Sequence, residues 1–281
     1  ILSAYRPNIR LHKNFRPVLN LAGFELDATA NFTGNGDQLR LTDGSATLTS
    51  SDIELRFTPT RASLKPTATP YLQDLQADVV LQFSDTSALS QYVEAPVPAL
   101  GPVTASASML QHGKTFSLQG VEARVSGELM TIHTTGSIAD LTSMSGIELN
   151  SRLSHLDTRS RLLIALKDFR YQADLGSLQG QFTLTNPGRV WRVSDIDIQT
   201  AAPGGRLDLA LSGDVHALGP SAASQLDVSL HVRDTALLEA LSGLPMSPLV
   251  AEMRIAGSRG LVTANADTRV GDTILNAEAA I

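Results

Sequence analysis

Cysteine is absent from this chain of 281 residues. Disulfide bonds and metal sites built on thiolates are therefore excluded. A lack of cysteine fits a protein of the oxidising periplasm, and it fits many cytosolic proteins equally well. Aromatic residues make up only 5% of the chain. This scarcity disfavours an extracellular adhesin or a carbohydrate-binding solenoid, because such proteins hold sugars on aromatic platforms.

Long apolar runs are also missing. No stretch approaches the ~18–20 consecutive apolar residues that a membrane-spanning helix needs. The chain starts with Ile1 and finishes in an alternating run from Thr273 to Ile281. We therefore expect that the chain is a fragment of a longer protein. The lack of a signal peptide or membrane helix in it then says nothing about the parent protein.

Motifs for catalysis and for nucleotide binding are lacking in the sequence. The histidines stand alone, without a His-x-His or His-x-x-x-His pair, and Gly34-x-Gly36 has no third glycine. Neither a Gly-x-Ser-x-Gly elbow nor a Walker sequence is present. Asp195 and Asp197 alternate with apolar neighbours, as on an exposed strand face. We expect no enzyme, no metal site and no cofactor.

Charges of both signs are interspersed along the chain. The net charge is −6 and the isoelectric point is about 5.5. This balance disfavours nucleic acid as a partner, and it disfavours electrostatic attachment to an anionic membrane.

An Asp-Thr sequence recurs at nearly equal intervals along the chain, at Asp85, Asp157 and Asp234. Each copy follows an alternating, strand-like run and begins an apolar segment with helical spacing. An Asp at a helix N-cap accepts a hydrogen bond from a free N–H group of the first turn. Each copy therefore predicts a strand that leads into a short capped helix, most clearly from Asp85 to Val93.

A second feature recurs in phase with the first: a glycine-bearing turn followed by an alternating strand. These strands start at Leu39, Phe116, Trp191 and Leu261, again at nearly equal intervals. Because this slot is apolar each time, we expect Trp191 to pack within the sheet. Self-similarity at a fixed period is typical of a repeat architecture, in which one unit stacks on the next.

The two periodic features predict one continuous array over residues 1–281, with approximate units 1–78, 79–154, 155–225 and 226–281. The repeat period is roughly 70–77 residues, so that the first and last units are incomplete. From Phe24 onward the pattern is β, so we expect an all-β fold with short helices. The expected form is an elongated antiparallel sheet of ~15 strands, about 70 Å long, whose apolar face forms a groove. A sandwich or barrel would instead cover that face with a second sheet.

The candidate lipid-binding residues are the apolar members of the alternating runs. Ile53 and Leu55, for example, alternate with Glu54 and Arg56. Periodicity alone favours an ordinary sealed core for such residues. The predicted groove-lining set is Ile53, Leu55, Phe57, Val79, Leu81, Phe83, Met109, Phe116, Leu118, Ile147, Leu149, Ile198, Leu207, Leu209, Leu211, Val228, Leu230, Met253 and Ile255.

Several short motifs occur together in this chain. They are Ala95-Pro96-Val97-Pro98-Ala99-Leu100-Gly101-Pro102-Val103, then Phe116-Ser117-Leu118, Gly136-Ser137-Ile138-Ala139-Asp140-Leu141, and the echo that ends in Leu211-Ser212-Gly213-Asp214-Val215-His216-Ala217-Leu218. With these motifs the chain resembles the AsmA-like proteins of Gram-negative bacteria, a family that includes the TamB type. The resemblance covers roughly residues 75–281, and more loosely 20–74.

The resemblance implies a large protein anchored in the inner membrane, whose repeated β-sheet forms an extended hydrophobic groove through the periplasm. It implies phospholipid acyl chains as ligands, with inner- and outer-membrane proteins as partners at the ends of the parent chain. No catalytic motif is implied. With this resemblance, the favoured interpretation of the alternating apolar residues is the lining of an open groove and not a sealed core.

Two functions from different classes are compatible with these observations. The first is a non-enzymatic groove that carries phospholipids across the periplasm, between the inner and outer membranes. The second is a scaffold for outer-membrane protein biogenesis, in which exposed sheet edges pair with strands of client proteins.

Overall fold

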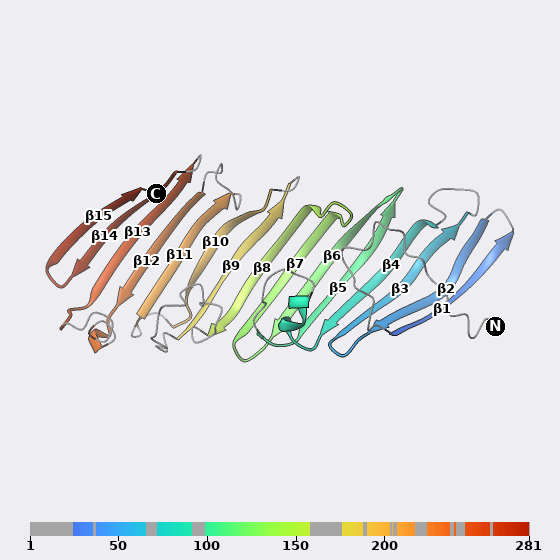
Figure 1. Ribbon diagram of the computed structural model, residues 1–281, viewed down its shortest axis with the longest axis horizontal. Helices are drawn as coiled ribbons and strands as arrows, with labels where there is room; N and C mark the ends of the chain where they lie inside the picture. Colours follow the sequence, from blue (N-terminus) through green and yellow to red (C-terminus); the bar gives the residue numbers. More distant parts are fainter. Residues whose placement is uncertain are drawn as a thin grey trace.

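One antiparallel sheet of fifteen strands makes up almost the whole described structure (Figure 1). The computed structural model describes residues 25–35, 38–65, 72–91, 99–157, 176–187, 190–202, 204, 207–216, 224–236, 239, 245–258 and 261–280. The strands are β1 (Glu25–Asn35), β2 (Gln38–Thr49), β3 (Ile53–Leu64), β4 (Leu72–Phe83), β5 (Val103–His112), β6 (Thr115–Ser126), β7 (Met130–Asp140), β8 (Ser145–Asp157), β9 (Ser177–Asn186), β10 (Arg192–Thr200), β11 (Leu207–His216), β12 (Ser224–Val232), β13 (Leu249–Ser258), β14 (Leu261–Val270) and β15 (Thr273–Ala280).

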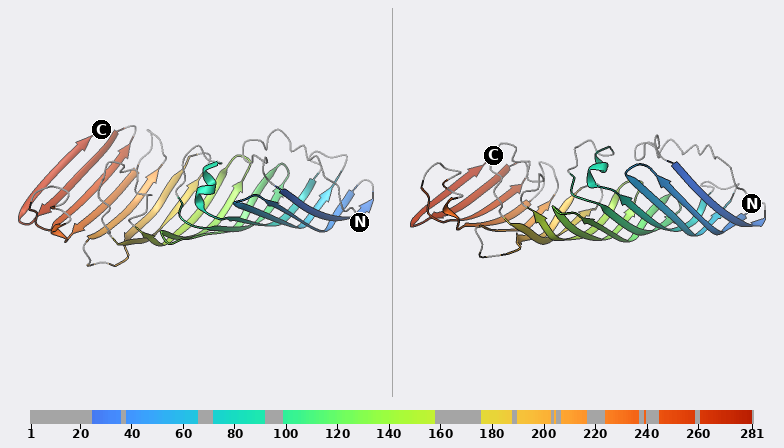
Figure 2. Two further views of the ribbon diagram at one scale, coloured as in Figure 1. Left: turned by 60° about the horizontal axis from the view of Figure 1, so that its bottom comes forward. Right: turned by 90° about the horizontal axis from the view of Figure 1, so that it is seen from below.

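The strands follow one another in chain order, and each pairs with its neighbours in the sequence. The sheet is therefore a meander that stays open, with β1 and β15 at its edges. Figure 2 shows it curved along its length into a trough, with the short 3₁₀ helix η2 (Thr86–Gln91) on the concave side. The prediction of an elongated, open, all-β sheet is confirmed.

The sequence landmarks recur every fourth strand. The Asp-Thr copies come at the ends of β4, β8 and β12, and the strands that follow glycine-bearing turns are β2, β6, β10 and β14. One period of the sequence therefore corresponds to four strands of the meander. The unit boundaries themselves stay a prediction.

Asp85 connects η2 to the start of β5. Its carboxylate accepts hydrogen bonds from the backbone N–H of Ser87 (2.8 Å) and from that of Gly101 (2.8 Å). The hydroxyl of Thr86 accepts a further bond from the N–H of Leu100 (2.8 Å). A capped helix is present where it was expected after Asp85, as the 3₁₀ segment Thr86–Gln91; the rest of the expected range, to Val93, lies outside the described residues.

The other two Asp-Thr copies differ from the first. Asp234 accepts a bond from the N–H of Ala236 (3.1 Å), as expected for a cap. Asp157 is itself the last residue of β8, and the helix expected after it lies outside the described residues. Trp191 precedes β10 and is 36% exposed, so the prediction that it packs within the sheet is wrong.

The core is a single apolar layer and not a filled space between two sheets. Two small clusters are buried, one around Ala62, Leu75 and Ala77 and another around Leu207 and Val232. Among the described residues, no large side chain is completely buried. The apolar side of the sheet therefore remains partly open to solvent.

Candidate functional site on the apolar face of the trough

All nineteen predicted groove-lining residues lie on the same face of the sheet. In an antiparallel pair, residues directly opposite each other point to the same side. Phe57 pairs with Val79, and Leu209 pairs with Leu230. The cross-strand partners of each following strand place all the other residues of the set on this same face. That these residues bind lipid stays a prediction.

The predicted residues are shielded to different degrees. Ile53, Phe83, Ile147 and Leu207 are buried, whereas Met253 is 37% exposed. The remaining fourteen are half-buried. Side chains on the concave side of a curved sheet converge and shield one another, so we assign the apolar face to the concave side of the trough.

A continuous line of apolar residues crosses the sheet from β3 to β15. Each member is directly opposite the next, and no member is polar or charged. We name this line the apolar row, and it consists of Ile53, Phe83, Val103, Val125, Ile132, Leu153, Gly180, Ile198, Leu211, Val228, Met253, Ala266 and Ala277. At ~4.8 Å per strand, its twelve steps span roughly 58 Å.

Several members of the apolar row were missing from the sequence-based set. Val103, Val125, Ile132 and Leu153 each stand in an alternating run, so their period of two could have identified them. The small residues Gly180, Ala266 and Ala277 gave no such signal. Their place in the row becomes visible only when the strands are paired.

The few polar groups on the apolar face are largely paired with one another or with the backbone. The hydroxyls of Thr134 and Ser151, opposite each other on β7 and β8, lie 3.0 Å apart. Asn186 is 2% exposed and donates to the carbonyl of Met144 (2.9 Å). The hydroxyl of Thr200 accepts a bond from the N–H of Leu209 (2.7 Å). These contacts keep most of the polar groups engaged with the protein, although the side-chain oxygen of Asn186 lacks a partner in the described structure.

The opposite face carries an equally continuous line of hydrophilic side chains, one residue out of step with the apolar row. We name it the polar row, and it consists of Glu25, Thr49, Glu54, Gln82, Thr104, Arg124, His133, Arg152, Gln181, Asp197, Ser212, Asp227, Arg254, Asn265 and Glu278. It has one member on every strand of the sheet.

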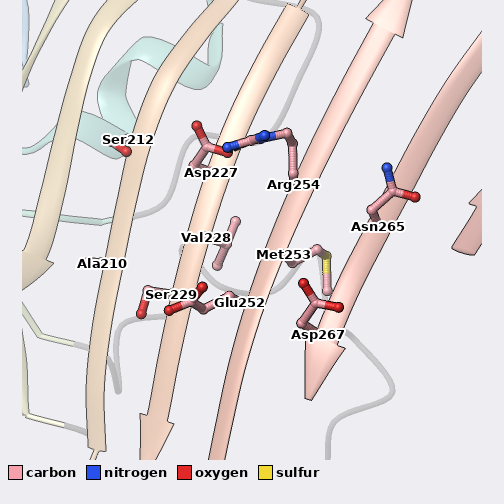
Figure 3. Close-up of a pocket in the computed structure, with 10 residues that line it drawn as sticks. All are labelled: Ala210, Ser212, Asp227, Val228, Ser229, Glu252, Met253, Arg254, Asn265 and Asp267. Carbon is pink, nitrogen blue, oxygen red and sulfur yellow. Dashed lines mark hydrogen bonds and ion pairs between the residues drawn. The ribbon is translucent and has the colours of Figure 1, made fainter. Parts of the chain in front are cut away.

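Figure 3 shows a shallow hollow of about 360 Å³ on this polar face, over β11 to β14. Arg254 extends across to Asp227, and their Nε and Oδ1 atoms lie 2.7 Å apart. The hydrogen bond from Arg254 holds the pKa of the Asp227 carboxyl below its ordinary value. Glu252 and Asp267 also line the hollow. The hollow is polar and open, unlike the lining of the apolar face.

Within the described ranges, no group of three or more histidine, cysteine, aspartate or glutamate side chains is arranged so that it could hold a metal ion. A helix of the length and apolarity needed to cross a bilayer was likewise not found in the described part of the chain.

Comparison with known proteins gave no relative: no protein-family model, no curated protein and no solved structure matches this chain. A function for the chain must therefore be inferred from the geometry of its two faces.

Proposed function

We propose that the apolar face of the trough binds the acyl chains of phospholipids and carries them along the sheet, without chemical change to the lipid. The observation that supports this most directly is the apolar row, which stays free of polar members across thirteen adjacent strands. No second sheet covers it within the described residues.

The dimensions suit several acyl chains in succession. A bilayer has a hydrocarbon core of ~30 Å, so one acyl chain extends roughly 15 Å. The apolar row, at roughly 58 Å, is several times longer. Each methylene group removed from water contributes about 0.8 kcal/mol, which favours residence of a chain on this face. Because similar apolar residues repeat at every strand, no single position fixes the lipid.

The proposed setting comes from the AsmA-like resemblance. In that setting the trough lies in the periplasm, as part of a parent protein anchored in the inner membrane. Phospholipids then move between the inner and outer membranes, with membrane proteins as partners at the ends of the parent chain. An open sheet with one continuous apolar face is the shape that such a role requires.

A charged substitution on the apolar face tests the proposal. Leu209 is half-buried on that face, whereas its neighbour Ala210 is exposed on the polar face. We expect Leu209→Asp to lose co-purifying phospholipid, measured by native mass spectrometry. An acyl chain lying over the new carboxylate would remove that charge from water, which is costly. Ala210→Asp adds the same charge one residue away and is expected to retain the lipid. Equal lipid content in both variants, or no lipid in the unmodified protein, contradicts the proposal.

A second candidate function rests on the edge strand β15. Ile274 and Leu275 are 67% and 57% exposed, and one hydrogen-bonding side of β15 has no partner in the described sheet. An edge of this kind can pair with a strand of another protein. A scaffold for outer-membrane protein assembly therefore stays a candidate.

A lysine substitution at the edge separates the two functions. Ile274 lies on the polar face of β15, opposite Arg269. We expect Ile274→Lys to weaken pairing with an added β-strand peptide, measured by crosslinking, and to leave lipid content unchanged. Loss of lipid in this edge variant, together with normal lipid content in Leu209→Asp, contradicts the conduit and favours the scaffold.

A further inference from the structure

Three basic side chains stand side by side in the middle of the polar row. Arg124 on β6 is directly opposite His133 on β7, and His133 is directly opposite Arg152 on β8. The β-carbons of such neighbours lie about 4.5–5.5 Å apart. The side chains of Arg124 and His133 are 59% and 40% exposed, and Arg152 is exposed as well. The basic triad, as we name these three residues, is partly accessible from solvent, although the Nε2 atom of His133 is buried and forms no hydrogen bond in the described structure.

The carboxylate of Glu122 lies close to the first two members of the basic triad. Oε1 of Glu122 lies 2.6 Å from Nη2 of Arg124 and 3.3 Å from Nε2 of His133. The hydrogen bond and positive charge of Arg124 hold the pKa of the Glu122 carboxyl below its ordinary value. Arg152 forms no ion pair or hydrogen bond within the part of the chain that the structure describes. The basic triad therefore carries more positive than negative charge.

The rest of the polar row shows that this arrangement is not a general property of the face. Arg254, the other arginine of the row, is directly opposite Asp227 and bonded to it. Arg124 and Arg152 lie on either side of His133, and Glu122 is the one carboxylate bonded to either arginine in the described structure. A bound anion reduces the repulsion between the two guanidinium groups.

Hydrogen-bonding side chains surround the unpaired end of the basic triad. A hollow of about 390 Å³ is lined by His133, Thr135, Asn150, Arg152, Gln181 and Thr183, among others. Hydroxyl and amide groups donate to oxygen, and guanidinium groups form strong, geometrically specific bonds with oxyanions. Among the described residues, Asp195 is the one carboxylate that lines this hollow, so the site suits a compact anion held toward Arg152.

We propose that the basic triad, with Thr135 and Asn150 beside it, is a binding site for a phosphate-type oxyanion on the outer face of the sheet. This site lies on the face opposite the acyl-chain path and is independent of it. The phosphate can belong to a free small molecule or to a lipid headgroup presented to the outside of the trough. Both sources offer the same tetrahedral group to Arg152 and to the hydrogen-bonding side chains of the hollow, with Arg124 nearby.

Titration of the folded chain with inorganic phosphate and with sulfate tests the site, with the side-chain signals of His133 and the arginines followed by NMR. We expect saturable binding that Arg152→Gln weakens by about tenfold or more, as for loss of one charged hydrogen bond. Glu122→Gln removes the competing carboxylate and is expected to tighten binding. Circular dichroism confirms that each variant is folded.

Arg56→Gln is the matched control. Arg56 is also exposed on the polar face and bonds Glu54 two residues away (2.7 Å), but its cross-strand neighbours are Thr47 and Val80. We expect this variant to bind sulfate as the unmodified chain does. Absence of saturation, or equal weakening in Arg56→Gln and Arg152→Gln, overturns the site.

Two further measurements separate the possible sources and functions. Competition between inorganic phosphate and phosphatidylglycerol vesicles, lost in Arg152→Gln, indicates a lipid headgroup; binding of phosphate without vesicle binding indicates a free small molecule. Leu209→Asp is expected to leave oxyanion binding unchanged, so failure of the acyl-chain proposal does not affect this test. Loss of oxyanion binding in Leu209→Asp contradicts a site that belongs to the outer face.

Discussion

The two faces of this single sheet share one backbone but differ completely in chemistry. The apolar row and the polar row run side by side, offset by one residue: Phe83 follows Gln82, and Leu211 precedes Ser212. Members of the apolar row are mostly buried or half-buried, whereas most members of the polar row are exposed. In a layer that no second sheet covers in the described structure, curvature and alternation separate the two environments.

This comparison shows why the register is fixed. A slip of one residue between two strands would turn every apolar side chain of one strand to the outer face. Because the alternation holds on strand after strand, each pair of neighbours opposes such a slip. The trough therefore keeps its apolar face aligned without a second sheet to hold it.

The largest expected effect comes from removing a buried side chain of the apolar row. Phe83 is 9% exposed between Ile53 and Val103. We expect Phe83→Ala to destabilise the sheet by about 3–5 kcal/mol, since large-to-small changes lose burial and leave a cavity. Gln82→Ala, on the exposed side of the same strand, is expected to change stability by under ~0.5 kcal/mol. Urea unfolding and hydrogen exchange of β3–β5 measure both.

Equal effects of the two substitutions contradict the comparison. If Phe83→Ala costs no more than Gln82→Ala, the apolar face contributes little to stability. The continuity of the sheet would then depend on backbone pairing alone.

Much of this fold could be predicted from alternation alone, because period-two patterning specifies both the strand and its face. Ile53, Leu55 and Phe57 were placed correctly in this way. The irregular positions could not be predicted, since they depend on pairing: Asp195 adopts a φ of +53° where β10 is bulged against both neighbours. Trp191 was misplaced because it precedes β10 and does not belong to its ladder.

The basic triad could not have been found from the sequence. Arg124, His133 and Arg152 stand in three separate alternating runs, and no motif links them. Only the register between β6, β7 and β8 brings them into line. In a meander, contacts of this kind depend on hairpin length and bulges, which composition and spacing do not determine.

The second expected effect concerns a glycine of the apolar face. Gly213 adopts a φ of +133°, and a β-carbon there would lie 2.2 Å from the carbonyl oxygen of Gln225 on β12. We expect Gly213→Ala to destabilise the chain by roughly 1–3 kcal/mol, because both the backbone and the neighbouring strand must shift. Ser212→Ala on the polar face is the control, with little expected change in the urea midpoint. A neutral Gly213→Ala contradicts this close approach of β11 and β12.

A smaller effect is expected at Asp85, which holds η2 on the concave side. Partial burial raises the pKa of the Asp85 carboxyl, but hydrogen bonds from Ser87 and Gly101 outweigh it, so the net pKa lies below the ordinary value. The stabilisation is therefore present above the unfolded pKa of ~3.9 and is lost as the pH falls through the lower folded value. We expect Asp85→Ala to cost about 1 kcal/mol at pH 7, a typical value for a cap.

Hydrogen exchange at Ser87 and Gly101 reports this change. The difference between the unmodified chain and Asp85→Ala is expected to shrink as the pH falls from ~3.9 through the lower folded pKa of Asp85, because only below that folded value is the carboxylate protonated in both the folded and unfolded states. Ser84→Ala, one residue away, leaves the Asp85 contacts in place and is expected to show no such pH dependence. A difference that grows on acidification contradicts a lowered pKa of Asp85 in the folded chain.

The smallest effect is expected for an ion pair of the polar row. Asp227 and Arg254 are bonded at 2.7 Å, but their side chains are 40% and 66% exposed, so water and salt screen their attraction. We therefore expect Asp227→Asn to leave the urea midpoint unchanged at neutral pH, at both low and high salt. Because the pKa of Asp227 is lowered in the folded chain, any stabilisation by this ion pair is present at pH values above the unfolded pKa. Acidification can therefore only remove that stabilisation. A loss as large as that of Gly213→Ala would show that the polar face also stabilises the sheet, and the division of roles between the two faces would then be wrong.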